Sequence, residues 1–388
     1  MTEITEQFIP THIKISDFNI TEQVNSIIVP KKDISIHMKN LKNLLYHREK
    51  IKPVIPIDDS SSRILLQTPS SEKLTQVIEQ QKYEIEPFEI QLTIENFTSM
   101  DIMKKYIPSN IQLPTSYETV GELAHMNLKE EQMEYKYIIG EAYLLKTYPR
   151  IKTFITKTAE ISNEFRTFPM EVIAGKNSTE VSVICHGVKF TLDYAKCYWN
   201  TRLETEHIRI IEKMKPNEIL CDAFAGVGPF AIPAALKGVT VYANDLNPDS
   251  TKYMKINAEK NKVNIDIETM DAREYMKKIV LEKHIQPHYI LMNLPATAVE
   301  FLDVVPELNL EHCVIHCYGF SAYEDARDLV ARANELLKKE YEITVRKVRD
   351  VAPKKLMFCL NIHVNQNELK RNFEDVEKDV PESKRKLE

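Results

Sequence analysis

The sequence predicts an α/β protein whose C-terminal half is a doubly wound, mostly parallel sheet. From about residue 216 to 364, apolar strand-like runs alternate with segments of helical spacing, the pattern of successive βα units. A turn of small residues, Gly226–Ala231, follows the first of these runs. The last two strand-like runs are separated only by Ala352-Pro353-Lys354, so they must pair as an antiparallel hairpin.

The elements of this half follow one another with short breaks. Seven strands that end in such a hairpin are the plan of a Rossmann-like class I methyltransferase domain, whereas the ordinary dinucleotide fold lacks the hairpin. Strands are expected at 218–224, 240–245, 265–271, 288–294, 313–320, 342–351 and 355–364. Helices are expected at 229–237, 248–262, 272–283, 297–307 and 323–339.

Smaller α+β domains are expected ahead of this sheet. A charged helical pattern covers about 33–50, and Pro108 and Pro114 indicate a linker. Polar, highly charged residues at the C-terminal end predict disorder. The sequence therefore predicts four parts, namely an N-terminal α+β domain at 1–112, a middle α+β domain at 113–200, the Rossmann-like domain at 201–367 and a disordered tail at 368–388.

The composition is that of a globular protein of more than one domain. The chain has 388 residues, which is too long for one ordinary hydrophobic core. Of these residues 43% are hydrophobic and 28% are charged, as in a globular protein. No apolar stretch is long enough to cross a bilayer, and the N-terminus lacks the apolar core of a secretory signal. The six cysteines form no CxxC pair, which favours reduced thiols and no metal site.

The net charge of −6 argues weakly against a nucleic-acid partner, because phosphate contacts need Lys and Arg. Two segments, 31–52 and 146–157, nevertheless concentrate basic residues. Each segment is either a surface for a polyanion or a solvated face, and the sequence leaves both readings open.

The glycine turn predicts a site for a nucleotide-bearing cofactor. Gly226 and Gly228 fit the G-x-G-x-x-G/A pattern, and Asp245 ends the second strand, where an acid bonds ribose hydroxyls. Pro229 is expected to open the following helix. The turn alone does not separate a nicotinamide cofactor from S-adenosylmethionine.

Polar residues at three other strand ends favour S-adenosylmethionine. Asp222 precedes the glycine turn, and Asp271 ends the third strand, where an aspartate commonly receives the adenine amine. Asn293-Leu294-Pro295-Ala296 ends the fourth strand, like the Asn/Asp-Pro-Pro-aromatic signature of amino-group methyltransferases, although two positions differ. Each acid also precedes a helix, so a helix N-cap is the competing interpretation.

Five motifs together resemble the eukaryotic and archaeal tRNA (guanine-37-N1)-methyltransferase family. They follow one another in the order and with the spacing of that family, and the resemblance covers about residues 116 to 364. The motifs are GELAHMNL (121–128), ISNEFRTFPMEVIAG (161–175), YWNTRLETEHIRI (198–210), DAFAGVGPF (222–230) and NLPA (293–296).

The resemblance implies methylation of N1 of guanosine 37 in tRNA, with S-adenosylmethionine as cofactor. It implies that Glu206 is the general base and that Arg166 holds the O6 oxygen of guanine, with Asn293 and Pro295 at the acceptor pocket. It also implies an N-terminal domain that inspects the outer corner of tRNA, a monomer, and a cytoplasmic or nuclear location, with the mitochondrial matrix known for some members. The expected cofactor-binding residues are His207, Phe224, Gly226, Gly228, Asp245, Leu246, Asp271, Ala272 and Asn293.

Three alternatives remain open from the sequence. The same fold also suits transfer of the aminocarboxypropyl arm of the cofactor onto a modified tRNA base. The glycine turn also fits an NAD-dependent dehydrogenase. Finally, a non-catalytic RNA-binding protein would keep the fold without the chemistry.

Overall fold

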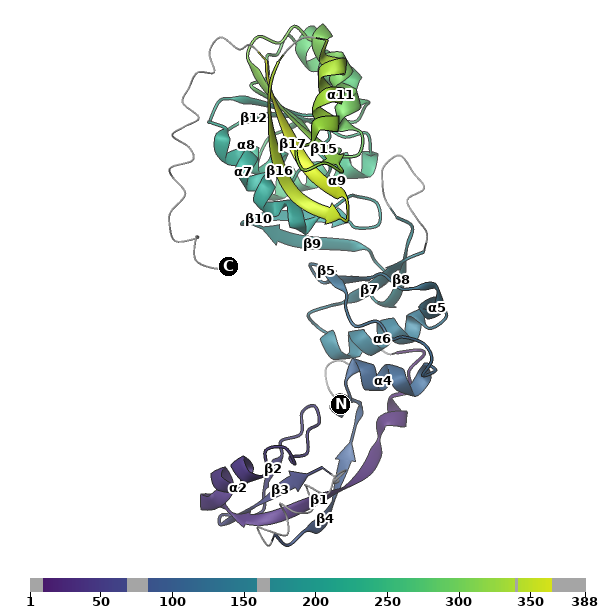
Figure 1. Cartoon of the computed structure of the whole chain (residues 1–388). Helices are drawn as coiled ribbons and strands as arrows, with labels where there is room; N and C mark the ends of the chain where they lie inside the picture. The colour runs from purple at the N-terminus through teal and green to yellow at the C-terminus, as the bar shows by residue number, and fades with distance from the viewer. Residues whose placement is uncertain (1–9, 68–82, 159–167, 339–340, 365–388) are drawn as a thin grey trace. The chain divides into compact units, whose positions relative to one another are not determined.

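The computed structural model describes residues 10–67, 83–158, 168–338 and 341–364. The chain forms two compact units (Figure 1). The first comprises Met1–Thr158 with Met170–Thr179, and the second comprises Ala159–Pro169 with Glu180–Glu388. The Arg166 position falls outside the described residues.

The second unit is built on a seven-stranded sheet in the order β13-β12-β11-β14-β15-β17-β16. The first five strands of that order run parallel, β17 is antiparallel to β15, and β16 is antiparallel to β17. This confirms the predicted class I methyltransferase plan. The strands are β11 (Ile219–Asp222), β12 (Thr240–Asn244), β13 (Asp266–Glu268), β14 (Tyr289–Met292), β15 (Cys313–Ser321), β16 (Glu342–Ala352) and β17 (Lys355–Val364).

Helices cover both faces of this sheet because each strand carries apolar side chains on both sides. One hydrophobic cluster joins the sheet to α7, α8 and α9, and another joins its opposite face to α10, η6 and α11. In Figure 1, α7 and α8 lie to one side of the strands and α11 to the other. The helices are η4 (Thr201–Leu203), α7 (Glu204–Lys213), α8 (Ala231–Leu236), α9 (Pro248–Lys260), α10 (Ala272–Lys277), η5 (Lys278–Glu282), η6 (Ala298–Glu307) and α11 (Arg327–Leu337).

The hairpin of β9 (Glu180–Cys185) and β10 (Val188–Asp193) packs on this unit. Val188 and Phe190 of β10 are buried against Ala258 of α9. The α9 side chain of Asn257 exchanges two hydrogen bonds with the Thr191 backbone, at 2.7 and 3.1 Å. We therefore count the hairpin with the second unit, whereas the sequence predicts a boundary at residue 200.

The first unit contains two four-stranded sheets, in the orders β2-β3-β1-β4 and β5-β6-β7-β8. A single hydrophobic cluster runs between them through α4 and α6. Its strands are β1 (Ile20–Pro30), β2 (Val54–Pro56), β3 (Ser61–Leu66), β4 (Glu86–Leu92), β5 (Glu118–Val120), β6 (Leu123–Met126), β7 (Thr153–Lys157) and β8 (Met170–Gly175). Its helices are η1 (Ile15–Phe18), η2 (Lys31–Asp33), α2 (Ile34–Asn40), η3 (Ile94–Asn96), α4 (Ser99–Tyr106), α5 (Glu130–Met133) and α6 (Lys136–Thr147).

The charged helix expected at about 33–50 is wrong beyond Asn40, where α2 ends. Leu41, Leu44 and Leu45 are buried against the first sheet. Leu45 also forms a bridge with Leu66 of β3. The burial of these three leucines in the tertiary structure therefore decides the backbone after Asn40, and the helical spacing of the charged residues does not.

Among the described residues, no helix is both long and apolar enough to cross a membrane. All six cysteines are free thiols, and five of them are buried.

Buried His316 should make the second unit sensitive to acid. Its Nδ1 lies 2.8 Å from Asn361 Oδ1, and burial lowers its pKa to about 3. The unfolded chain binds a proton below about pH 6.5, so the free energy of unfolding should fall by up to about 1.4 kcal/mol per pH unit below that value. Urea unfolding at several pH values measures this slope. His316→Gln should make the slope shallower, whereas His284→Gln at an exposed position should not change it; equal slopes in all three proteins would contradict the assignment.

Candidate active site

The parallel strands end at one edge of the sheet, here called the carboxyl edge. The strand order reverses between β11 and β14, and ligands of open α/β sheets bind at such a reversal. Asp222 ends β11, Asp245 follows β12, and Asn293 follows β14. These three predicted residues therefore meet at the carboxyl edge.

The glycine turn has the backbone that the pattern predicts. Gly226 and Gly228 have φ angles of +56° and +94°, a region that favours glycine. A Cβ on Gly226 would meet nothing within 4 Å, whereas a Cβ on Gly228 would lie 2.8 Å from Ile232. The Ile232 amide donates to the Gly228 carbonyl, but α8 begins at Ala231 with Phe230 as its N-cap, so Pro229 lies just before the helix and does not open it as predicted. Gly226 is therefore open to a ligand, and Gly228 is packed.

Asp245 connects the end of β12 to the glycine turn. Its two carboxylate oxygens accept from the Gly226 amide at 2.8 Å and from the Asn247 amide at 2.9 Å. Burial raises the pKa of Asp245, and these two amides oppose that shift. The neighbouring Leu246 is 45% exposed.

Asn244 is a structural residue that the sequence reading missed. Its buried side-chain amide donates to the Ala223 and Met270 carbonyls and accepts from the Met270 amide. One side chain thus joins the loops after β11, β12 and β13. An asparagine at the end of an apolar strand would have been the signal.

Asp222 is completely buried at the centre of the edge. Within the described part of the chain, no donor makes a hydrogen bond of good geometry to either carboxylate oxygen. Burial raises the pKa of Asp222 well above its usual range; the Phe224 backbone partly offsets this, and the charge of Asp245 adds to it. A carboxylate in such a place favours a cationic or hydrogen-bonding ligand.

Asp271 serves as the N-cap of α10, as the competing interpretation proposed. Its Oδ1 accepts from the Arg273 and Glu274 amides, at 2.8 and 3.4 Å. The side chain remains exposed, and Ala272 beside it is buried. Phe224 packs edge-on against Phe301, with ring centroids 5.0 Å apart.

The turn after β14 is held by its backbone. The Leu294 carbonyl accepts from the Thr297 and Ala298 amides, and the Pro295 carbonyl accepts from Phe320. Asn293 Oδ1 is buried, and no described residue donates to it. The turn therefore presents an acceptor that is shielded from water and has no protein partner among the described residues.

Glu206 lies in the first turn of α7 and is only 6% exposed. Both of its oxygens accept from Arg209, with Nε of Arg209 2.7 Å from Oε2. The Tyr318 hydroxyl donates to Oε1 at 2.8 Å. Glu206 is therefore a buried, paired carboxylate, not a solvated one.

His207 packs beside this pair on the same helix. Its ring lies edge-on to Phe230, 4.5 Å between centroids, and burial lowers its pKa to about 4. Its Nδ1 is buried, and the described residues offer it no hydrogen bond. The ring is neutral at physiological pH.

Strand register places Asn293 at the level of Tyr318, the residue whose hydroxyl binds Glu206. In the parallel pair β14–β15, Met292 lies opposite Cys317, so Asn293 continues to the level of Tyr318. Leu291 and Tyr318 belong to the cluster on the α7 face, and alternation turns Asn293 to that same face. Adjacent strands lie about 4.8 Å apart, so Asn293 lies beside the hydroxyl-bearing residue that binds Glu206.

The basic segment 146–157 belongs to the first unit. There, Lys146 pairs with Glu49 at 2.7 Å and Lys152 with Glu122 at 2.8 Å, so acidic partners already neutralise two of its charges.

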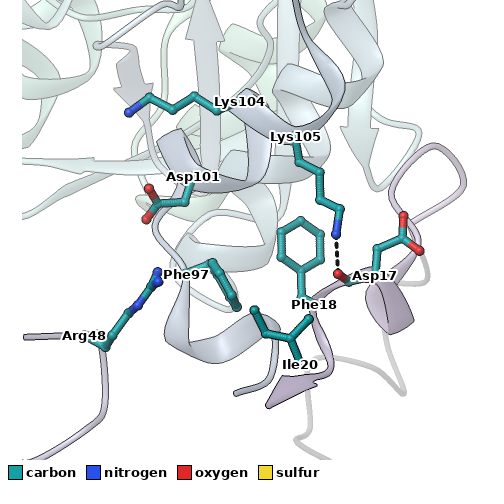
Figure 2. A pocket seen from close by; sticks show the side chains of 8 residues that line it. All are labelled: Asp17, Phe18, Ile20, Arg48, Phe97, Asp101, Lys104 and Lys105. Carbon is teal, nitrogen blue, oxygen red and sulfur yellow. Dashed lines mark hydrogen bonds between the residues drawn. The ribbon is translucent and has the colours of Figure 1, made fainter. Parts of the chain in front are cut away.

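A separate pocket in the first unit has a volume of about 190 Å³. Figure 2 shows apolar side chains between Arg48 on one side and Lys105 on the other. Arg48 lies 4.9 Å from the Phe97 ring centroid, and Lys105 lies 4.9 Å from that of Phe18. The lining residues are Asp17, Phe18, Ile20, Arg48, Phe97, Asp101, Lys104 and Lys105.

The sheet order and the carboxyl-edge residues define the second unit as a class I methyltransferase domain. The family model described as TRM5/TYW2 methyltransferase domain matches residues 182–348, and the TYW2 N-terminal domain model matches 100–179. The chain is 63% identical to the tRNA (guanine(37)-N(1))-methyltransferase of Entamoeba histolytica over 376 residues, 97% of each chain. The chain belongs to the tRNA (guanine(37)-N(1))-methyltransferase family.

Solved structures agree with this assignment. Trm5b from Pyrococcus abyssi is 28% identical, with a TM-score of 0.59 over 88% of this chain and 99% of that one. Methanocaldococcus jannaschii Trm5 in complex with adenosine is 26% identical, with a TM-score of 0.53 over 88% and 99% of the two chains.

Proposed function

We propose that this chain transfers the methyl group of S-adenosylmethionine to N1 of guanosine 37, next to the anticodon of tRNA. The relative from Entamoeba histolytica carries this activity in its name. The observation that supports the proposal is the register of β14 and β15, which puts Asn293 at the level of Tyr318, whose hydroxyl binds the buried Glu206 carboxylate. In the proposal, the Asn293 amide and this carboxylate face the same substrate base.

The carboxyl edge fits S-adenosylmethionine by its chemistry. The cofactor carries a sulfonium and an ammonium group, and the buried oxygens of Asp222 and Asn293 are acceptors without protein donors of good geometry among the described residues. Gly226 leaves space beside its backbone for close approach. Methanocaldococcus jannaschii Trm5, a relative of this chain, forms a complex with the nucleoside adenosine.

Each expected cofactor residue has a role in this proposal. Asp245 accepts ribose hydroxyls with the lone pairs that Gly226 and Asn247 leave free. Asp271 receives the adenine amine through the oxygen that does not cap α10. Apolar walls and backbone contacts complete the site, and come from His207, Phe224, Gly228, Leu246 and Ala272.

Methylation at N1 needs a base, because N1 of guanine carries a proton at neutral pH. When bound, S-adenosylmethionine supplies a methyl group on a sulfonium sulfur. Glu206 accepts the N1 proton as the N1–carbon bond forms and the carbon–sulfur electron pair returns to sulfur. Arg166 donates to O6, where negative charge develops. Asn293 and Pro295 hold the guanine ring with its N1 edge toward the Glu206 carboxylate.

Mass spectrometry of unmodified tRNA, incubated with the protein and S-adenosylmethionine, should place one added methyl on guanosine 37. A label on the carboxyl carbon of the cofactor should remain unincorporated. Its appearance in tRNA would instead indicate aminocarboxypropyl transfer.

Glu206→Gln should lower the single-turnover rate by roughly 10²- to 10⁴-fold, because the general base is lost. Affinity for tRNA should change little, since the amide keeps the shape of the carboxylate. Glu212→Gln, on an exposed position of the same helix, is the matched control and should react like the wild type. Normal turnover by Glu206→Gln would exclude this residue as the base.

The two glycines should respond differently to alanine. Gly226→Ala should cost only about 1 to 2 kcal/mol of stability from its left-handed backbone, yet weaken binding of S-adenosylhomocysteine, because the new Cβ occupies ligand space. Gly228→Ala should lower the melting temperature further, since its Cβ collides with Ile232. Calorimetric titration and thermal unfolding separate the two effects. Wild-type affinity in Gly226→Ala would show that no ligand approaches this turn.

The N-terminal domain expected at 1–112 is proposed to contact tRNA through the pocket of Figure 2. Three basic residues, Arg48, Lys104 and Lys105, outnumber the two aspartates of its lining and suit phosphate, and its apolar side chains suit a base or ribose. Lys104→Ala should weaken tRNA binding and reduce its salt dependence by about one unit of log–log slope. Lys39→Ala on α2, exposed and outside the pocket, is the charge-matched control. Equal losses in both variants would indicate diffuse attraction rather than this pocket.

A further inference from the structure

The carboxylate of Glu206 is held by more donors than an ordinary helix glutamate. Arg209 binds both oxygens through its guanidinium fork, and Tyr318 adds a third hydrogen bond at Oε1. Its place in the first turn of α7 adds the positive end of the helix. Together these contacts hold the carboxylate in one orientation.

The donors are distributed unevenly between the two oxygens. Oε1 accepts from Arg209 and from Tyr318, whereas Oε2 accepts from Arg209 alone among the described residues and has Arg346 Nε at 4.0 Å. A carboxylate oxygen offers two lone pairs in its plane. Oε2 therefore keeps a lone pair for a proton that arrives from outside the pair.

The partners themselves are buried and hold fixed charge states. Burial alone opposes the charge of Arg209, but its hydrogen bond and attraction to Glu206 outweigh that effect and raise its pKa. Burial raises the pKa of Tyr318 far above its usual value, and Cys359 and Glu206 add to this. The other groups around the carboxylate are His207 and Lys213 on α7, Arg346 on β16 and Cys359 on β17, whose pKa burial raises to about 12.

We propose that Arg209 and Tyr318 are positioning residues for the reaction, which hold the Glu206 carboxylate in place and present Oε2 as the atom that takes the N1 proton. Neither residue touches the reacting atoms in this proposal. It rests on the proposed role of Glu206 as the base. Its distinctive consequence is a change in the pH dependence of the chemical step, not only in its rate.

The test is the single-turnover methylation rate as a function of pH, at saturating tRNA and S-adenosylmethionine. Arg209→Met leaves a buried carboxylate without its counter-charge, which favours the protonated form. The acid limb of the profile should therefore move up by about 1 to 3 pH units, and the rate should approach that of the wild type at alkaline pH. Arg209→Lys keeps the charge and should restore most of the acid limb.

Tyr318→Phe removes a donor but no charge, so it should move the limb in the same direction by a smaller amount. Tyr318→Phe also tests the inference on its own if Arg209→Met does not fold. Arg332→Met removes another guanidinium pair, with Glu300 on a different face, and should leave the profile unchanged. A rate that falls equally at every pH in the Arg209 and Tyr318 variants, or an acid limb that does not move, overturns the inference.

Glu206→Gln, measured in parallel, separates the two proposals. If it retains turnover, the assignment of the base fails, and this inference fails with it. If it is inactive while the acid limbs of the Arg209 and Tyr318 variants do not move, the base stands and only the positioning role fails.

Discussion

A buried carboxylate stays charged only when the protein replaces the water it loses, and this constraint governs the face of the sheet that α7 covers. The desolvation of an unpaired carboxylate costs several kcal/mol. Glu206 avoids it through Arg209, one helical turn away, and through Tyr318 from β15. Since Tyr318 lies at the level of Asn293 on the neighbouring strand, the same packing that satisfies Glu206 also places it beside the turn after β14.

Hydrogen bonds between side chains and the backbone organise the loops at the carboxyl edge. Asn244 ties together the loops after three strands, and Asp245 holds the amide of Gly226. On the other side, Asn257 binds both the β10 backbone and the Val227 carbonyl of the glycine turn, at 3.0 Å for the latter. The hairpin β9–β10 is thus connected to the turn through a single buried side chain, so a displacement of the hairpin would strain the turn directly.

Sequence periodicity predicted the Rossmann-like half almost element by element, because alternating βα units leave a strong signal and a three-residue link permits only a hairpin. It failed at 33–50, where burial of Leu41, Leu44 and Leu45 decides the backbone. Sequence position alone did not distinguish the surroundings of the three acids: Asp222 is buried without a described hydrogen-bond donor of good geometry, Asp245 is bonded to the glycine turn, and Asp271 caps a helix. Tyr318 was missed as a partner of Glu206 because their contact depends on the packing of α7 against β15, 112 residues apart in sequence. Arg209 lies three residues after Glu206 on the same helix, so the i,i+3 spacing was a signal that could have identified it.

The contacts that Arg209 and Tyr318 make with Glu206 fix the position of the base but do not change the acidity of its substrate. Glu206 is a carboxylate, and a carboxylate removes the N1 proton of guanine only if that proton becomes more acidic in the site. Stabilising the charge that appears on O6 does this, and so does a positive sulfonium close to N1. The proposed roles of Arg166 and Glu206 are therefore interdependent, because part of the barrier must be lowered from the O6 side of the ring.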